Sequence, residues 1–120
     1  MLFRSAAGKK LATQLKAARE SFLQVVDFVV ANVKTKPNDV FAGSVPYLFL
    51  TANLVCGWQM GRALIAAEDN LAAGNDAPFM EAKIATARFY GDHILARVAS
   101  LRDTILNGGE SVTALSLDAF

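Results

Sequence analysis

The side chains suited to acid–base or nucleophilic chemistry are few and isolated in this sequence. His93 is its single histidine and Cys56 its single cysteine. His93, beside Asp92, falls off the apolar seam of its helix, which is typical of a surface or interface histidine. Cys56 lies in an apolar run without a basic partner, and Ser44 and Ser111 have no neighbouring base. We therefore expect no catalytic residue in this chain.

Metal and phosphate sites lack their sequence signatures as well. A carboxylate-bridged helical bundle needs the spacing Glu-x-x-His, and here Tyr90 stands three positions before His93. No glycine-rich loop between a strand and a helix offers its backbone N–H groups to a phosphate. The sequence therefore predicts no metal-binding and no cofactor-binding residue in this chain.

The charge distribution does not favour a nucleic acid or a membrane as partner. The net charge is +1; residues 1–36 hold seven basic side chains against Glu20 and Asp27, but no aromatic residues are interleaved on that basic face. The apolar run 45–60 is shorter than the roughly 20 residues that a membrane span requires, and it contains Asn53 and Gln59. Because the start also lacks a signal-peptide pattern, we expect a cytoplasmic protein.

Helical periodicity predicts three long helices. They cover about residues 6–34, about residues 46–71, and the segment from the turn at 74–78 to the glycines at 108–109. Apolar residues recur at steps of three and four along the first helix, at Leu11, Leu15, Ala18, Phe22, Val25, Val29 and Val33. The same steps form a seam on the third helix, at Met80, Ile84, Ala87, Gly91, Ile94, Val98, Leu101 and Ile105.

The breaks between these helices set the fold class. Gly43, Ser44 and Pro46 predict a kink or break at the start of the second helix, with Asn38 or Asp39 able to cap it. Gly74 suits the end of that helix, and Asp76 can cap the next. Short connections favour antiparallel neighbours. We therefore expect a single all-α domain over residues 1–120, an up-down-up antiparallel bundle of three long helices, or four if the second breaks at Pro46 or the tail is helical.

The second helix is apolar nearly all round, so it should be covered by its own bundle and by another chain or domain. Gly57 and Gly61 lie one turn apart, where a neighbouring helix can come close, and Gly91 is a candidate counterpart. Arg62 and Arg88 interrupt apolar surfaces, so each should pair with a carboxylate or reach across an interface. The carboxylates considered are Asp69, Glu81 and Asp92. The predicted packing and interface residues are Tyr47, Phe49, Gly57, Trp58, Gly61, Arg62, Arg88 and Gly91.

Several blocks in the second half carry a resemblance to a known family. They are Tyr47-Leu48 after Pro46, GWQMGRA at 57–63, KIATARFY at 83–90, GESV at 109–112, and Ala119-Phe120. In order and spacing, residues 45–120 resemble the extra C-terminal helical domain found in one branch of the acyl-CoA dehydrogenase flavoproteins, the 3-methylmercaptopropionyl-CoA dehydrogenase-like branch. The first helix matches only in length and character.

The resemblance implies a role within a larger enzyme. In that family the full protein oxidises an acyl-CoA thioester at its α,β bond, with a glutamate removing the α proton and flavin adenine dinucleotide (FAD) accepting the hydride. Neither the glutamate's segment nor the flavin-binding domains are in this chain. The resemblance therefore implies a C-terminal fragment that packs against the catalytic domains of the parent, helps to form a homodimer, and is not active alone.

Two other functions stay open at this point. One is a freestanding helical interaction module whose apolar groove receives a partner helix. The other is a small helical enzyme or ligand carrier, which would need a polar cluster inside the bundle. The seams of the helices are almost wholly aliphatic, and this disfavours the enzyme or carrier.

Overall fold

The computed structural model describes residues 3–120, and within them the chain is helical with no strand. The elements are α1 (Ala6–Asn32), α2 (Pro37–Ala42), α3 (Ser44–Ala72), α4 (Ala77–Tyr90), the π-helical turn η1 (Gly91–Leu95), α5 (Arg97–Asn107), α6 (Gly109–Thr113) and the 3-10 turn η2 (Leu117–Ala119). The predicted all-α bundle is confirmed. The first and third helices lie where the periodicity placed them.

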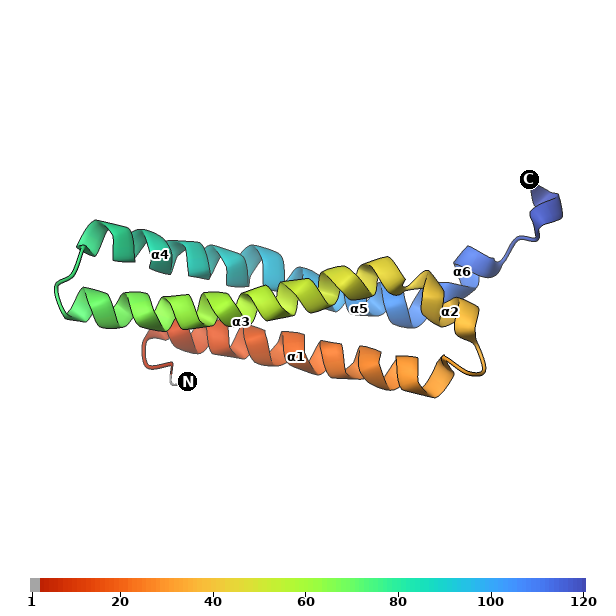
Figure 1. Ribbon diagram of the computed structural model, residues 1–120, viewed down its shortest axis with the longest axis horizontal. Coiled ribbons are helices and arrows are strands. Elements are labelled where there is room, and N and C mark those ends of the chain that lie inside the picture. The colour runs from red at the N-terminus through yellow and green to blue at the C-terminus, as the bar shows by residue number, and fades with distance from the viewer. Residues whose placement is uncertain (1–2) are drawn as a thin grey trace.

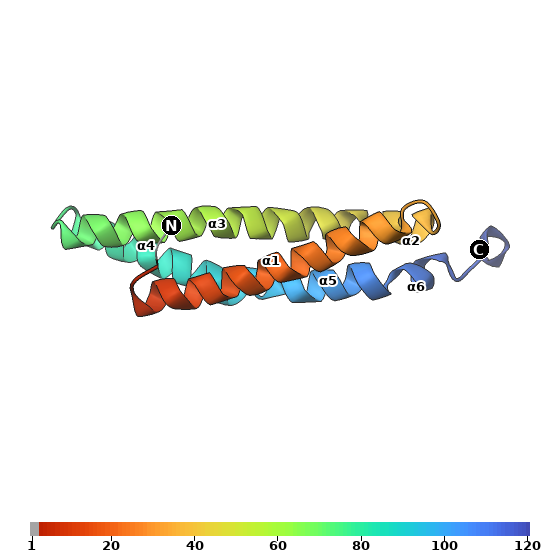
Figure 2. The ribbon, with the colours of Figure 1, turned by 90° about the horizontal axis from the view of Figure 1, so that it is seen from below.

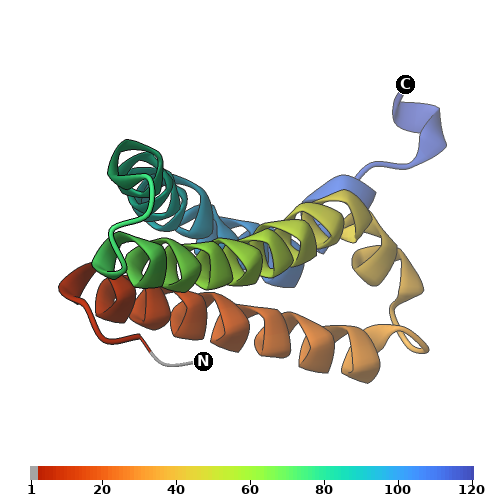
Figure 3. The ribbon, with the colours of Figure 1, turned by 60° about the vertical axis from the view of Figure 1, so that its left-hand side comes forward.

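The long helices run up, down and up (Figure 1). α3 lies in the middle and runs antiparallel to α1, while α4, η1 and α5 return along it as a third, interrupted helix. Seen from below, α1 crosses the bundle beside α5 (Figure 2). α1 packs on η1 and α5 but touches α4 little, so α4 diverges from it at one end (Figure 3). The molecule is elongated and thin, with extents of 66 × 28 × 16 Å.

The core follows the predicted seams of α1 and of the third helix. Its largest fully buried side chains are Leu11, Val25, Leu50, Leu64, Val98 and Ile105. Burying each such aliphatic side chain contributes about 1.5–3 kcal/mol. These residues come from α1, α3 and α5, so the three long helices hold one common core.

The break before the second long helix lies at Gly43, the first of the three residues predicted to interrupt the start of that helix. α2 ends at Ala42, and α3 begins at Ser44 with Pro46 in its first turn. A proline is tolerated there because the first N–H groups of a helix have no acceptor within it. The predicted break is therefore confirmed at Gly43, whereas a break at Pro46 itself is wrong. Capping by Asn38 or Asp39 is also wrong, since Lys36 precedes α2 and gives no side-chain cap.

The turn between α3 and α4 follows the prediction in part. Gly74 has a φ of 78°, a left-handed conformation that glycine adopts without strain. Asp76 stands at the N-cap position of α4 with a φ of 41°, but its side chain makes no capping hydrogen bond. The turn at Gly74 is confirmed, whereas side-chain capping by Asp76 is wrong.

The third helix contains a π-helical turn that the sequence pattern did not reveal. Between Gly91 and Leu95 the backbone widens, and it resumes α-helical geometry at Arg97. The wider turn brings Leu95 into the core, where it is 4% exposed, while the predicted seam residue Ile94 is only half-buried. The seam therefore passes from Gly91 through Leu95 to Val98, and its predicted step at Ile94 is wrong.

Candidate interaction surface

The three glycines predicted to allow close helix packing do so, but on different neighbours. A Cβ atom on Gly57 would stand 2.6 Å from Leu95 Cδ2, and one on Gly61 would stand 3.3 Å from Leu15 Cδ1. Gly91 does not face these two glycines. Its missing Cβ instead makes room for α1, whose Leu11 Cδ1 would be 2.9 Å away. The prediction of close approach is confirmed, and the prediction of Gly91 as a counterpart is wrong.

The two arginines on the apolar helices make no ion pair within residues 3–120. The Arg62 guanidinium lies over the Trp58 ring, 5.5 Å from its centroid, and donates a hydrogen bond of 3.3 Å to Gln59 Oε1. Arg88 is exposed on α4. Pairing with Asp69, Glu81 or Asp92 is therefore wrong for the described chain. The other alternative, that these arginines reach across an interface, stays a prediction.

Asp92 forms its contacts with α1 rather than with an arginine. Its Oδ1 accepts from Lys10 Nζ at 2.9 Å and from Gln14 Nε2 at 2.8 Å. The hydrogen bond from Lys10, followed by that from Gln14, lowers the pKa of the Asp92 carboxyl below its ordinary 3.8. His93 is exposed and stacks on Phe89 with ring centroids 4.5 Å apart, so its predicted surface position is confirmed.

Two tyrosines, Tyr90 and Tyr47, take part in the packing around α3. The Tyr90 hydroxyl donates to the Asn53 carbonyl at 2.9 Å. Burial, and secondarily the neighbouring Cys56 thiol, raises the pKa of Tyr90 above its ordinary 10.0. Tyr47 is half-buried, with its ring 6.2 Å from that of Phe22. Tyr47 is therefore part of the internal packing.

The start of α3 exposes a row of large apolar side chains. Phe41 precedes it on α2, and Val45, Leu48 and Phe49 occupy its first two turns. Each is between 56% and 64% exposed. We call these four residues the junction face. Because large exposed apolar groups are uncommon on isolated domains, the junction face is a candidate interaction surface.

A second apolar surface is a groove of 530 Å³ between α1 and α3. Its lining residues are Phe3, Ala12, Leu15, Lys16, Arg19, Phe22, Leu23, Leu54, Val55 and Trp58. Lys16 and Arg19 are the charged residues among them, and Trp58 remains 49% exposed. Of the lining residues, only Trp58 was predicted as an interface residue. The signal that could have found the rest is the spacing of Lys16, Arg19 and Leu23, which places them on one face of α1 beside its buried seam.

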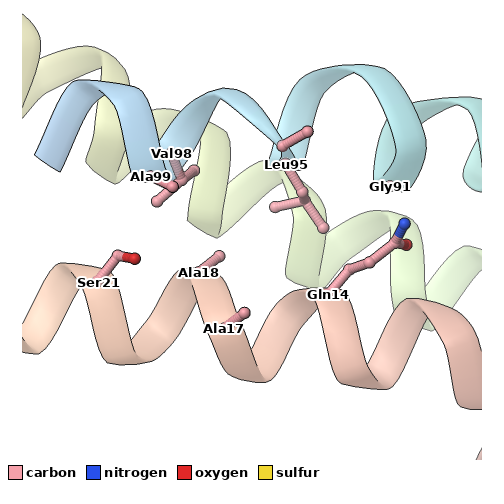
Figure 4. Close-up of a pocket in the computed structure, with 9 residues that line it drawn as sticks. Gln14, Ala17, Ala18, Ser21, Gly91, Leu95, Val98 and Ala99 are labelled. Carbon is pink, nitrogen blue, oxygen red and sulfur yellow. The ribbon is translucent and has the colours of Figure 1, made fainter. Parts of the chain in front are cut away.

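A smaller crevice of 160 Å³ lies between α1 and the helix that contains η1 (Figure 4). None of its lining residues is ionisable, and most are small alkyl side chains. Ser21 is buried there, and its Oγ accepts a hydrogen bond of 3.2 Å from Arg102 Nη1. The crevice therefore offers no group that could run acid–base chemistry.

The polar side chains elsewhere do not converge either. A hollow of 250 Å³ where α1, α2 and α6 meet contains Lys36, Asp39 and Glu110, and two of these three side chains are exposed. In the described part of the chain, no three metal-ligating side chains come together. No helix among these residues has the length and hydropathy that crossing a bilayer demands. The features that stand out are thus two apolar surfaces.

The family match and the similar proteins found by comparison agree with one another. The family described as "Acetyl-CoA dehydrogenase C-terminal like" matches residues 3–116. The chain is 41% identical over 112 residues to 3-methylmercaptopropionyl-CoA dehydrogenase of Ruegeria pomeroyi, which covers 93% of this chain and 19% of that protein. It is 32% identical over 81 residues to the broad-specificity linear acyl-CoA dehydrogenase FadE5 of Mycobacterium tuberculosis, covering 65% of this chain and 13% of that protein.

The chain thus spans less than a fifth of the length of these relatives. The match includes both long helices that border the groove and the third helix that packs on them. The resemblance seen in residues 45–120 therefore extends over nearly the whole chain, α1 included, and the chain belongs to the acyl-CoA dehydrogenase C-terminal domain family.

Proposed function

We propose that this chain is the C-terminal packing and dimerisation domain of a flavin-dependent acyl-CoA dehydrogenase. The parent enzyme would oxidise an acyl-CoA thioester at its α,β bond, with FAD held by domains outside residues 1–120. The proposal is supported by the family membership and by the names of the relatives. This domain would supply cover and assembly, and the chemistry would belong to its partner domains.

The observation that carries the proposal is the amount of surface. A compact monomer of 12.8 kDa exposes about 6,300 Å², whereas this chain exposes 7800 Å². The excess of about 1,500 Å² is larger than the roughly 800 Å² that each partner contributes to a standard protein interface. A thin domain with this excess of exposed surface gains stability when another domain or chain covers part of it.

The junction face is the surface we assign to the catalytic domains of the parent. It is purely apolar, whereas the groove carries two cations, and large permanent interfaces are the more apolar kind. Phe49 and its neighbours would stabilise this contact because their apolar side chains would be buried against the catalytic domains. A cytoplasmic location, expected from the sequence, remains part of the proposal.

The test uses the full-length parent enzyme with one charge placed in the junction face. Phe49→Glu should disrupt docking, because it would bury an unpaired carboxylate. Phe79→Glu on α4 is the matched control, since Phe79 is 52% exposed against 56% for Phe49 and lies outside the junction face. We expect Phe49→Glu to lower FAD occupancy and acyl-CoA oxidation, with Phe79→Glu close to wild type.

Two results would count against the proposal. If Phe49→Glu left FAD content, oligomeric state and activity unchanged, the junction face would not be the docking surface. If residues 1–120 alone bound FAD tightly and oxidised acyl-CoA, the domain would be an enzyme in its own right. Circular dichroism of the isolated variants checks that each keeps its helical content.

The second candidate is a freestanding helical interaction module, which the open groove between α1 and α3 favours. The freestanding module and the fused C-terminal domain predict different gene structures. Several hundred in-frame codons upstream of Met1 would exclude the module. A stop codon shortly upstream would exclude the fused domain.

A further inference from the structure

The groove between α1 and α3 has a definite charge as well as an apolar floor. Among its lining residues, Lys16 and Arg19 are the charged ones and both are basic. Arg62 stands beside it, stacked over the groove residue Trp58. The groove is open, with Leu23, Val55 and Trp58 each more than 40% exposed. Small-molecule sites enclose most of their ligand, so an open trough of this kind suits a peptide segment that is apolar and acidic.

The end of this chain has that composition. Residues 109–120 contain Glu110 and Asp118 and no basic residue. Their large apolar side chains are Val112, Leu115, Leu117 and Phe120, which are 64–93% exposed. Asp118 lies between Leu117 and Phe120, the two most exposed large apolar residues among residues 3–120, so seating these two would bring its carboxylate to the rim of a groove.

We infer that the tail, residues 114–120, docks into the α1–α3 groove of a second copy of this chain, and that the exchange is reciprocal. Leu117 and Phe120 would cover the apolar floor around Trp58, and Asp118 would face Lys16 and Arg19. A two-fold axis makes both tail–groove contacts identical, so every favourable contact is formed twice. Exchange of a terminal element is a low-cost route to a dimer because no new fold is required.

The direction of the tail favours a second copy over the tail's own groove. The tail leaves the bundle beyond α2 and points away from α1 (Figures 1 and 2). The groove lies along the N-terminal two-thirds of α1, from Phe3 just before the helix to Leu23. A return to the tail's own groove would require the chain to reverse direction after α6. Docking into a partner leaves α6 in contact with α2, as it is here.

Trp58 is the only tryptophan, so its fluorescence reports on the groove alone. In the full chain, we expect a blue shift of its emission as protein concentration rises, in step with dimer formation measured by sedimentation equilibrium. Leu117→Ser with Phe120→Ser should abolish both changes. Phe79→Ser, an exposed apolar residue on α4, is the control and should preserve them.

A charge swap then identifies the contacting pairs. Lys16→Glu with Arg19→Glu, or Asp118→Lys, should each weaken the dimer about tenfold, because attraction becomes repulsion. All three changes together should restore affinity to within about threefold of wild type. The altered residues are all exposed, so the fold should be unaffected.

This inference rests on the dimerisation part of the proposed function, and the outcomes separate the two. A dimer that leaves Trp58 emission unchanged, or that survives the tail substitutions, overturns the tail exchange and keeps dimerisation. A blue shift independent of concentration places the tail in its own groove and also overturns the exchange. A chain that stays monomeric at high concentration overturns the exchange and the dimerisation role together, but leaves docking to the catalytic domains to its own test.

Discussion

Gly57 is one of the residues on which close helix packing depends. The position that its Cβ would take is 2.6 Å from Leu95 Cδ2 and 3.2 Å from Leu15 Cδ2. Leu95 is 4% exposed and cannot move aside without disturbing the core. Gly61, one turn further along α3, has looser neighbours, at 3.1 Å from Phe3 Cζ and 3.3 Å from Leu15 Cδ1.

Substituting each glycine with alanine should therefore have different effects. Alanine gains about 0.5–1 kcal/mol of helix propensity at either position. At Gly57 an overpacking penalty of about 1–3 kcal/mol exceeds that gain, so we expect Gly57→Ala to be destabilised by about 1 kcal/mol. Gly61→Ala should stay within about 0.5 kcal/mol of wild type. Urea unfolding followed by circular dichroism measures both, and equal stabilities would contradict the packing described here.

Asp92 gives the chain a pH dependence whose sign follows from its lowered pKa. A carboxyl with a lower pKa when folded stabilises the protein above its unfolded pKa, and this stabilisation is lost as pH falls through the folded value. Asp92→Asn removes the ion pair with Lys10. We expect a lower melting temperature than wild type at pH 7 and no difference well below pH 3.8. A difference that persisted in acid would assign the effect to something other than charge.

Among the elements, the π-helical turn η1 decides which side chain of the third helix enters the core. Heptad spacing selects Ile94, and the structure selects Leu95. Leu95→Ala should cost about 2–5 kcal/mol because it removes a fully packed side chain. Ile94→Ala should cost clearly less because Ile94 is half-buried. Thermal or urea unfolding compares the pair, and a larger loss at Ile94 would favour an uninterrupted α-helix.

The helices also show which structural features the sequence pattern could predict and which it could not. Steps of three and four on α1 were sufficient to locate Leu11 and Val25 in the core, because one regular helix has one buried face. The π turn escaped detection because its cause is tertiary: Gly91 and Leu95 pack closely on α1 and α3. Pro46 was misleading because a proline breaks a helix interior but fits its first turn.

For the whole molecule, the shape is the most direct observable. A compact chain of 120 residues has a radius of gyration of about 14 Å, whereas the Cα atoms here give 18.5 Å. Small-angle scattering of the dilute chain should return a value near 18.5 Å plus the hydration layer, and the value should rise with concentration as dimers form. A dilute value near 14 Å would mean that the helices collapse into a rounder bundle.

The candidate surfaces were predictable only in part. The apolar excess of the second helix indicated that a surface would need covering, and Phe49 and Trp58 are both exposed. Which side of that helix stays open depends on where α1 and α5 pack, and helix periodicity does not contain that information. The basic rim of the groove was missed because Lys16 and Arg19, taken singly, look like an ordinary solvated face.

The contact between Gly109 and α2 has a consequence for everything that follows it. A Cβ atom at position 109 would stand 2.9 Å from the Cα atom of Asp39, so any larger residue must push against the backbone of α2. Because α6 starts at Gly109, a larger residue there would push α6 away from α2 and change the direction of residues 110–120. The absence of a side chain at position 109 therefore sets the direction in which the end of the polypeptide leaves the bundle.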